Sequence, residues 1–261
     1  MPTIVLQSES RPRNPESAPP SNNPAQPDAA SGSTPYMRVI KSYILRGGRT
    51  GPGQARAFEQ YGPKYLLNYR PEPLDVAAAF GRAAPLFMEI GFGMGGATAH
   101  IAQVRPQDNF ICCEVHEPGV GSLLKLIGEG NIENIRIFRH DAVEVLDHML
   151  GESSLDGVHI FFPDPWHKSR HHKRRVIQGP FVHRLARHTK PGGYLHLATD
   201  WEPSAEQMHA VLDSEPLLSN TAAQPGPYGS APKPDYRPLT KFENRGIKLG
   251  HGVWDLVYRR V

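Results

Sequence analysis

The chain has 261 residues, of which 39% are hydrophobic, 29 are Lys or Arg and 26 are Asp or Glu, so its formal net charge is only +3. This length suits one sizeable α/β domain and leaves little room for a second. No apolar stretch approaches the about 18 residues that a membrane span needs, and the N-terminus lacks the apolar core of a signal peptide. Cys112 and Cys113 are adjacent, lie in an apolar run and have no second pair, which favours core residues in a reducing compartment over a zinc site. We therefore expect a cytoplasmic protein that does not span a membrane.

The first 35 residues differ in composition from the rest of the chain. They contain 8 of the 26 prolines, mixed with Ser, Asn and Ala. Such a segment cannot bury enough apolar surface to offset the entropy of ordering it, so we expect a disordered tail over 1–35 and a folded domain over 36–261. A basic patch begins that domain, and it fits a solvated linker and a phosphate-contacting arm equally well. The patch comprises Arg38, Lys41, Arg46, Arg49 and Arg56.

From residue 74 onward, the apolar pattern predicts helices and strands in alternation. Strands are expected near 86–90, 109–114, 134–138, 155–162 and 194–198, with a final strand over 252–260. Helices are expected near 74–80, 97–104, 117–128, 142–150, 176–189 and 203–213. This alternation predicts an α/β fold with a doubly wound, mostly parallel sheet, which binds ligands at the carboxyl ends of its strands. Residues 216–240 are rich in Pro and Gly and predict a long loop.

A glycine-rich turn over 91–96 connects the first of these strands to its helix. Glycines in such a turn adopt backbone angles that a Cβ forbids, and they let the main chain approach a ligand closely. Gly91, Gly93 and Gly96 satisfy the G-x-G-x-x-G pattern of dinucleotide binding, and Glu114, about 20 residues on, is placed to bind a ribose. The turn therefore predicts a nucleotide-type ligand and fits NAD and S-adenosylmethionine (SAM) equally.

Glu89 distinguishes these two ligands. Its carboxylate stands two residues before Gly91, where it would repel a pyrophosphate but suits a ligand that carries an ammonium or sulfonium charge. The series Glu89-x-Gly91-x-Gly93-x-Gly95 resembles motif I of class I SAM-dependent methyltransferases. We therefore predict SAM as the cofactor, with Glu89 facing its methionine part.

Carboxylates also stand at or just past the ends of the predicted strands up to 194–198. They are Glu89, Glu114, Asp141, Asp164 and Asp200. Because parallel strands end at the same edge of a sheet, we expect these acids to line one crevice. Glu114 is predicted to bind the ribose hydroxyls, and Asp141 to lie near the adenine amino group, as acids after the third strand do in related folds.

A strongly basic stretch follows the strand near 155–162. Pro163 and Pro165 stiffen the turn that holds Asp164. Between Asp164 and Asp200 the chain has eight Lys or Arg residues and no acidic residue. A run of one sign beside a ligand crevice indicates a polyanionic substrate such as a nucleic-acid backbone, with a solvated basic helix face as the alternative. The histidines of this stretch have no carboxylate or cysteine partner close after them in sequence, so no metal site is predicted.

Several motifs together resemble the tRNA (guanine-N7)-methyltransferase family of the bacterial TrmB type. They are Glu89 with its glycine turn, Pro163-Asp164-Pro165-Trp166 with Lys168 and the basic run, Gly192-Gly193 with Thr199-Asp200-Trp201, and Thr240-Lys241-Phe242-Glu243 with Arg245-Gly246. The resemblance runs from about Ile40 to the C-terminus. The tail and the detailed sequence of the 216–238 loop lie outside it.

The resemblance implies a Rossmann-like class I fold with a seven-stranded sheet, and methyl transfer from SAM to N7 of a guanine in tRNA, position 46 in the variable loop. SAM contacts are implied for Glu89, Glu114, Asp141 and Asp164, and Asp164 is implied to be catalytic. Substrate contacts are implied for Lys168, Asp200, Thr240, Lys241, Phe242 and Glu243. RNA contacts are implied for Arg170, His171, His172, Lys173, Arg174 and Arg175. A monomer and a homodimer both stay open, and no obligate protein partner is evident.

Three alternatives make different predictions. A SAM-dependent methyltransferase for a small molecule would have an apolar and aromatic lid where this chain places its basic run. An RNA-binding protein that lost catalysis has no reason to keep four acids beside an RNA surface. An NAD oxidoreductase leaves both Glu89 and the basic stretch unexplained.

Overall fold

The computed structural model describes residues 43, 48, 50–240, 243, 244, 246, 250 and 252–261. These residues belong to one compact unit, Ile40–Val261. The predicted tail and four residues of the basic patch, Arg38, Lys41, Arg46 and Arg49, lie outside the described residues, whereas Arg56 is exposed on the first helix.

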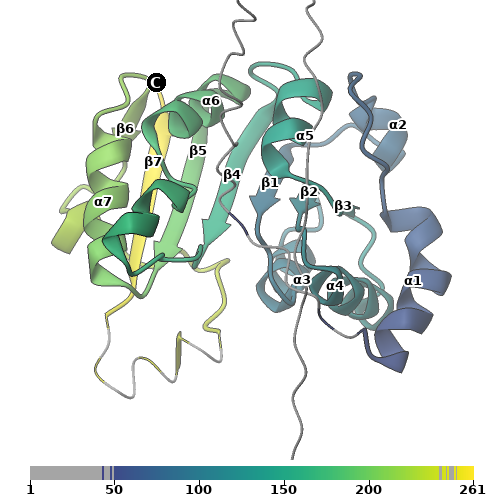
Figure 1. The fold of residues 1–261 in the computed structure, drawn as a ribbon. Coiled ribbons are helices and arrows are strands. Elements are labelled where there is room, and N and C mark those ends of the chain that lie inside the picture. The colour runs from purple at the N-terminus through teal and green to yellow at the C-terminus, as the bar shows by residue number, and fades with distance from the viewer. Residues whose placement is uncertain are drawn as a thin grey trace, which may run out of the picture. The chain divides into compact units, whose positions relative to one another are not determined.

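A seven-stranded sheet forms the centre of this unit, in the order β3-β2-β1-β4-β5-β7-β6 (Figure 1). The strands are β1 Leu86–Ile90, β2 Asn109–Cys113, β3 Ile135–Phe138, β4 Leu155–Phe161, β5 Thr189–Thr199, β6 Leu218–Asn220 and β7 Trp254–Arg260. Strands β1 to β5 pair in parallel, whereas β7 pairs antiparallel with β5 and with β6. The prediction of a doubly wound, mostly parallel, seven-stranded sheet is confirmed.

Helices cover the two faces of the sheet. They are α1 Pro52–Tyr65, α2 Val76–Phe80, α3 Gly96–Val104, α4 Glu117–Gly130, α5 Ala142–Met149, α6 Gly179–His188 and α7 Glu202–Asp213, with 3-10 turns η1 Ser169–Arg174 and η2 Pro227–Gly229. Buried residues of α1, α3 and α4 form one core with one face of the sheet. Those of α5, α6 and α7 form a second core with the other face. No helix in the described part of the chain is long and apolar enough to cross a membrane.

Strand β2 shows how the sequence specifies burial on both faces. All five of its residues are buried. Phe110 and Cys112 belong to the core with α3 and α4, and Ile111 and Cys113 to the core with α5 and α6, because successive side chains of a strand point to opposite faces. Both cysteines are free thiols, and burial raises the pKa of each. The interpretation of the pair as core residues is confirmed.

Helix α1 was not among the predicted elements, because the glycines and prolines at its start are more typical of loops than of helices. Pro52 occupies the first turn of the helix, where its missing N–H costs nothing. The Gln54 side chain accepts a hydrogen bond from the Gly51 N–H at 2.9 Å and completes the cap. The helix packs against α4 at two glycines, since a Cβ on Gly121 or Gly128 would collide with side chains of α1. Tertiary packing therefore stabilises an element whose local sequence is ambiguous.

The helix expected over 176–189 begins later, at Gly179, and a separate 3-10 turn, η1, precedes it. Pro180 explains the boundary, because proline lacks the N–H that a helix interior needs but fits a first turn. The basic stretch therefore forms a short, separate turn rather than the start of a long helix.

The segment expected to be a long loop, 216–240, contains β6 and η2 and then packs on the sheet. Ala231 forms an isolated bridge with Asp255 of β7. The Tyr236 ring lies 5.4 Å from the ring of His159 on β4, and its hydroxyl lies 2.7 Å from Nδ1 of His196 on β5. This segment therefore contributes a cover over β4, β5 and β7.

Candidate active site

A cavity of about 300 Å³ opens at the carboxyl ends of β1, β2, β3 and β4. Six of the residues predicted from sequence to form the site or its turn line it: Gly91, Gly93, Glu114, Asp141, Pro163 and Asp164. The remaining lining is mainly apolar and includes Ile90, Val143, Ile160 and Phe162. The expectation that strand-end acids share one crevice therefore holds for three of the five, one each after β2, β3 and β4.

The glycine turn leaves its ligand side open. Gly91 and Gly93 have φ of 75° and 58°, and a Cβ added to either would meet no atom within 4 Å. A ligand can therefore approach the main chain of both residues closely. Gly95 also has a positive φ, of 77°, but a Cβ there would lie 2.7 Å from Cβ of Leu123. In this structure Gly95 allows α4 to pack closely and does not line the cavity.

Glu114 follows β2, and main-chain donors fix its carboxylate. Oε2 accepts from the N–H of Gly93 at 2.9 Å, and Oε1 accepts from the N–H groups of Val115 and His116 at 2.8 and 3.0 Å. A carboxylate has about four lone-pair sites, so acceptor capacity is left for the hydroxyls of a ribose. These contacts hold the carboxylate against the glycine turn at the cavity wall.

Asp141 follows β3 and caps α5. Its Oδ1 accepts from the N–H of Val143 at 3.0 Å, which places the side chain at the cavity edge. A carboxylate at this position can accept a hydrogen bond from an exocyclic amino group. The local sequence explains the geometry, because aspartate is a preferred residue at helix N-caps.

Glu89 precedes the cavity-lining residues Ile90 and Gly91 but does not itself line the cavity, and it is buried, with 2% of its surface exposed. Burial raises its pKa to about 7, against a lowering by the nearby Thr98 hydroxyl and with a further rise caused by Glu114. Neither Oε2 of Glu89 nor Oγ1 of Thr98 has a hydrogen-bond partner among the described residues. A buried acid with an unsatisfied oxygen suits a cationic ligand, which would restore its charge. The acid, the open glycine turn and the strand-end carboxylates together fit SAM.

Asp164 lies on a strained turn after β4. It is exposed and lines the cavity. Two non-glycine residues of this turn adopt left-handed angles, Phe162 with φ of 50° and Trp166 with φ of 45°. Such angles are costly for bulky residues and concentrate at functional sites. The Phe162 N–H donates to the Ala198 carbonyl of β5 at 2.7 Å, which anchors the start of the turn.

The basic stretch continues directly from this turn. Lys168, Arg170 and Lys173 are exposed, while His171, His172 and Arg174 are half-buried. The Arg174 guanidinium lies 5.2 Å from the centre of the Trp166 ring. Among the described residues, no group of three or more His, Cys, Asp or Glu side chains has the arrangement of a metal site.

Arg175 differs from the other five predicted RNA-binding residues because it is buried, with 7% of its surface exposed. Its guanidinium donates to the carbonyl oxygens of Pro165 at 2.9 Å and Pro203 at 3.3 Å. The expectation of a surface contact between Arg175 and RNA does not fit this burial. The structure places Arg175 behind the Asp164 turn, which it connects to α7.

The predicted substrate residues separate into three groups. Lys168 and Asp200 are exposed at the ends of the Asp164 turn and of β5. Lys241 and Phe242 lie outside the described residues. Thr240 and Glu243 exchange hydrogen bonds in the manner of a helix capping box: the Glu243 N–H donates to Thr240 Oγ1 at 3.1 Å, and the Thr240 N–H donates to Glu243 Oε2 at 3.3 Å.

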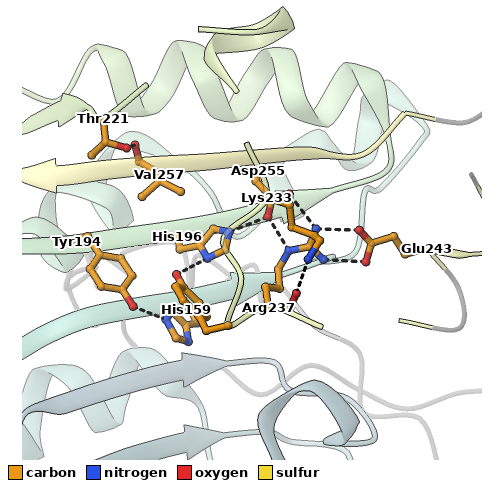
Figure 2. Close-up of polar contacts among 10 residues, drawn as sticks. His159, Tyr194, His196, Thr221, Lys233, Arg237, Glu243, Asp255 and Val257 are labelled. Atoms are coloured by element: carbon orange, nitrogen blue, oxygen red, sulfur yellow. Dashed lines mark hydrogen bonds and ion pairs between the residues drawn. The ribbon is translucent and has the colours of Figure 1, made fainter. Parts of the chain in front are cut away.

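Glu243 is buried, with 2% of its surface exposed, and its carboxylate pairs with Arg237. Figure 2 shows this pair continuing to Asp255 of β7 and His196 of β5. Sequence reasoning did not find Arg237, His196 or Asp255, because they are far apart along the chain. The only local signal was a basic residue, Arg237, three residues before Thr240.

Comparison with known proteins places this geometry in a family. Residues 83–256 match the protein family described as "Putative methyltransferase". The tRNA (guanine-N(7)-)-methyltransferase of Paracidovorax citrulli strain AAC00-1 is 66% identical and covers 92% of this chain and 96% of its own. That of Acidovorax sp. strain JS42 is 68% identical and covers 91% of this chain and 94% of its own.

Among solved structures, the crystal structure of PH0851 has a TM-score of 0.52 and 16% identity, and the match covers 80% of this chain and 46% of PH0851. At this identity the likeness shows the Rossmann-like fold alone. The curated relatives match with high identity over nine-tenths of the chain, which includes the glycine turn, the Asp164 turn and the basic stretch. As its motifs predicted, the chain belongs to the tRNA (guanine-N7)-methyltransferase family of the TrmB type.

Proposed function

We propose that the protein transfers the methyl group of SAM to N7 of a guanine in tRNA, at position 46 of the variable loop. One observation carries the proposal: Asp164 lines the cavity at the strand ends, and its turn continues directly into the exposed basic residues Lys168, Arg170 and Lys173. A cofactor site and a surface for a phosphate backbone therefore share one turn. The relatives named above act, by name, on guanine N7 of tRNA.

Different residues at the cavity bind different parts of SAM, which supplies an electrophilic methyl group when bound. Glu114, held by three N–H donors, accepts from the ribose hydroxyls. Asp141 accepts from the adenine amino group. Glu89 supplies negative charge near the cationic end of the cofactor. Gly91 and Gly93 have no side chain, so the cofactor can lie against their main chain.

Asp164 is the proposed catalytic residue. N7 of guanine has a free lone pair, so its attack on a methyl group needs no general base. The chain must instead align N7 with the carbon–sulfur bond, an effect worth several powers of ten in rate. As methyl transfer moves positive charge onto the purine, the Asp164 carboxylate orients the base and stabilises that charge. The stiff, strained turn keeps the carboxylate in place before the substrate arrives.

The basic stretch is the proposed tRNA-binding surface. Lys168, Arg170 and Lys173 are exposed, and they stand in the part of the chain that lacks any acidic residue between Asp164 and Asp200. Contacts with phosphates give affinity that falls with salt, while the base in the cavity determines which atom reacts. Transfer RNA is the proposed partner, and the cytoplasm is the proposed location.

The proposal is tested by incubating the protein with methyl-labelled SAM and unmodified tRNA, followed by nucleoside analysis of the RNA. We expect 7-methylguanosine with the wild type and none with Asp164→Ala. An Asp164→Asn variant with full turnover would contradict the role given to the carboxylate. Label at another nucleoside would keep the cofactor but reject the target. Binding of SAM without label in RNA would favour a small-molecule substrate.

A further inference from the structure

Arg237 is the most buried cation among the described residues, with 1% of its side chain exposed, and two carboxylates surround it (Figure 2). Its Nε and Nη2 donate to Oδ1 and Oδ2 of Asp255 at 2.6 and 2.8 Å. Its Nη1 and Nη2 donate to Oε2 and Oε1 of Glu243, both at 2.8 Å. One guanidinium therefore makes a paired contact with each of two acids, a geometry that lysine cannot reproduce.

The acids belong to different parts of the fold. Asp255 lies near the start of β7 and pairs in register with Ala198 of β5. It also accepts from Nε2 of His196, a buried imidazole whose pKa burial lowers, so that its neutral form donates to the carboxylate. Burial alone would raise the pKa of Asp255, but the hydrogen bonds from His196 and Arg237 outweigh it and lower that pKa. This half of the network is anchored in the sheet.

Glu243 belongs to the segment that carries the predicted substrate residues. Its carboxylate also accepts from the Thr240 N–H, and its own N–H donates to Thr240 Oγ1. Arg237 therefore holds Glu243 and, through it, Thr240, and Lys233 Nζ donates in turn to the Arg237 carbonyl at 2.8 Å. Through Arg237, the Glu243 carboxylate is connected to Asp255 of β7.

Arg237 also reaches the Asp164 turn. Its guanidinium lies 5.6 Å from the centre of the Phe162 ring. Phe162 lines the cavity, has a left-handed φ of 50° and stands two residues before Asp164. The same cation therefore contacts the beginning of the catalytic turn and the anchor of the predicted substrate segment.

Burying the charges of Arg237, Glu243 and Asp255 costs desolvation free energy, and apolar side chains of the same volume often stabilise a fold as well. A contribution to stability alone therefore does not explain the three buried charges. We propose that Arg237 is a positioning residue for methyl transfer: by pairing with Glu243 it fixes Glu243 and Thr240 at the correct place relative to the Asp164 turn. In this proposal, which rests on the function proposed above, Glu243 acts through Arg237 and not by touching the guanine.

The test compares Arg237→Lys with the wild type in three measurements: affinity for SAM, KM for tRNA, and kcat for 7-methylguanosine formation. We expect unchanged SAM affinity, a modest change in KM, and a kcat lowered by about 10- to 100-fold, because a displacement of about 1 Å in a reacting group can cost a hundredfold in rate. The Glu243→Gln variant should lower kcat in the same way. The double variant should be no worse than Arg237→Lys, since both single changes break the same contact between Arg237 and Glu243.

Arg136→Lys is the matched control. Arg136 is also buried, with 6% exposed, and it holds α2 to β3 by donating to the Ala79 carbonyl at 2.7 Å, on the part of the sheet away from β7. This control should lower the melting temperature and leave kcat unchanged. If Arg237→Lys lowers kcat no more than Arg136→Lys at equal folded fraction, or lowers SAM affinity in parallel with kcat, Arg237 only stabilises the fold.

If Arg237→Lys does not fold, Glu243→Gln is measured in its place, because it leaves the pair between Arg237 and Asp255 intact; unchanged kcat in that variant would reject the proposal. If the wild type forms no 7-methylguanosine at all, the proposed function fails before any variant is compared.

Discussion

Arg175 Nε donates a hydrogen bond of 2.9 Å to the carbonyl oxygen of Pro165, the residue that follows Asp164. The same guanidinium donates to Pro203 in the first turn of α7. The most basic segment of the chain therefore supplies one residue to the interior, where it holds the Asp164 turn, and presents others to solvent. The two kinds of residue are expected to differ in their kinetic effects.

Arg175→Lys is expected to lower kcat by about 10-fold or more, because lysine cannot reach both carbonyls and the Asp164 turn loses its support. The dependence of tRNA binding on salt should stay as in the wild type, since the buried Arg175 guanidinium is not available to a phosphate. Kinetics at several salt concentrations measure both quantities. A weaker salt dependence in this variant would instead assign Arg175 to the RNA surface.

Lys173→Ala is expected to change the salt dependence of tRNA binding and to leave kcat unchanged. Lys173 is exposed on η1, so its loss should weaken tRNA binding at low salt and reduce the slope of log K against log salt by about 1. Turnover at saturating tRNA should not change. Titrations of labelled tRNA at increasing salt provide the measurement, and a lowered kcat at saturation would show that Lys173 acts on the reacting base.

Gly119→Ala is expected to weaken SAM binding by about 10-fold or more, which corresponds to the usual cost of overpacking. A Cβ at position 119 would lie 2.2 Å from the Gly93 carbonyl oxygen, so it would displace the glycine turn. The Glu114 carboxylate accepts from the Gly93 N–H, so this displacement would also disturb that hydrogen bond. Calorimetric titration with SAM measures the effect. Gly53→Ala, also in the first turn of a helix but with no atom within 4 Å of the added Cβ, is the control and should bind SAM normally.

Glu89 is expected to make stability in the absence of SAM depend on pH. Burial raises its pKa from 4.5 to about 7, so its folded-state pKa is above the unfolded one. The contribution of Glu89 to the free energy of unfolding is then fully present below about pH 4.5 and is lost as pH rises through 7. By linkage, the free energy of unfolding falls by roughly 3 kcal/mol over this range. Glu89→Gln removes this titration. Urea unfolding of both proteins at pH 5 and pH 8 should show the wild type losing stability relative to the variant.

The same acid should tie cofactor affinity to pH. A bound cation favours the ionised form of Glu89, so SAM affinity is expected to rise between pH 6 and pH 8 in the wild type and to change less in Glu89→Gln. If SAM affinity depended on pH in the same way in both proteins, the Glu89 carboxylate would have no electrostatic interaction with the charge of the cofactor.

The sheet and its ligand edge could be predicted from sequence because their signals are local. The run that forms β1, the glycine turn and the acids after β2, β3 and β4 each have a pattern that a few residues specify. Helix α1 could not be predicted in this way, because its Pro52 and Pro63 resemble loop residues and its stability comes from α4. The start of α6 depended on the placement of Pro180.

The roles of single residues depended on tertiary contacts. Arg175 and Lys173 look equivalent in the sequence, and only burial separates them. Glu243 resembles a substrate ligand until its carboxylate is seen to pair with Arg237. Asp255 and His196 are 59 residues apart and meet because β7 pairs with β5. Periodicity and motif spacing carry no information on such contacts.

The direction of β7 also determines where the chain can be labelled. Because this strand runs antiparallel to β5, it starts beside Thr199, near the cavity, and ends at the opposite edge of the sheet, roughly 20 Å away. Val261 is 62% exposed there, and its N–H donates to the Leu217 carbonyl. A fluorophore or affinity tag attached to Val261 is therefore expected to stand away from the cavity, and an immobilised protein would present the cavity edge of its sheet to solution.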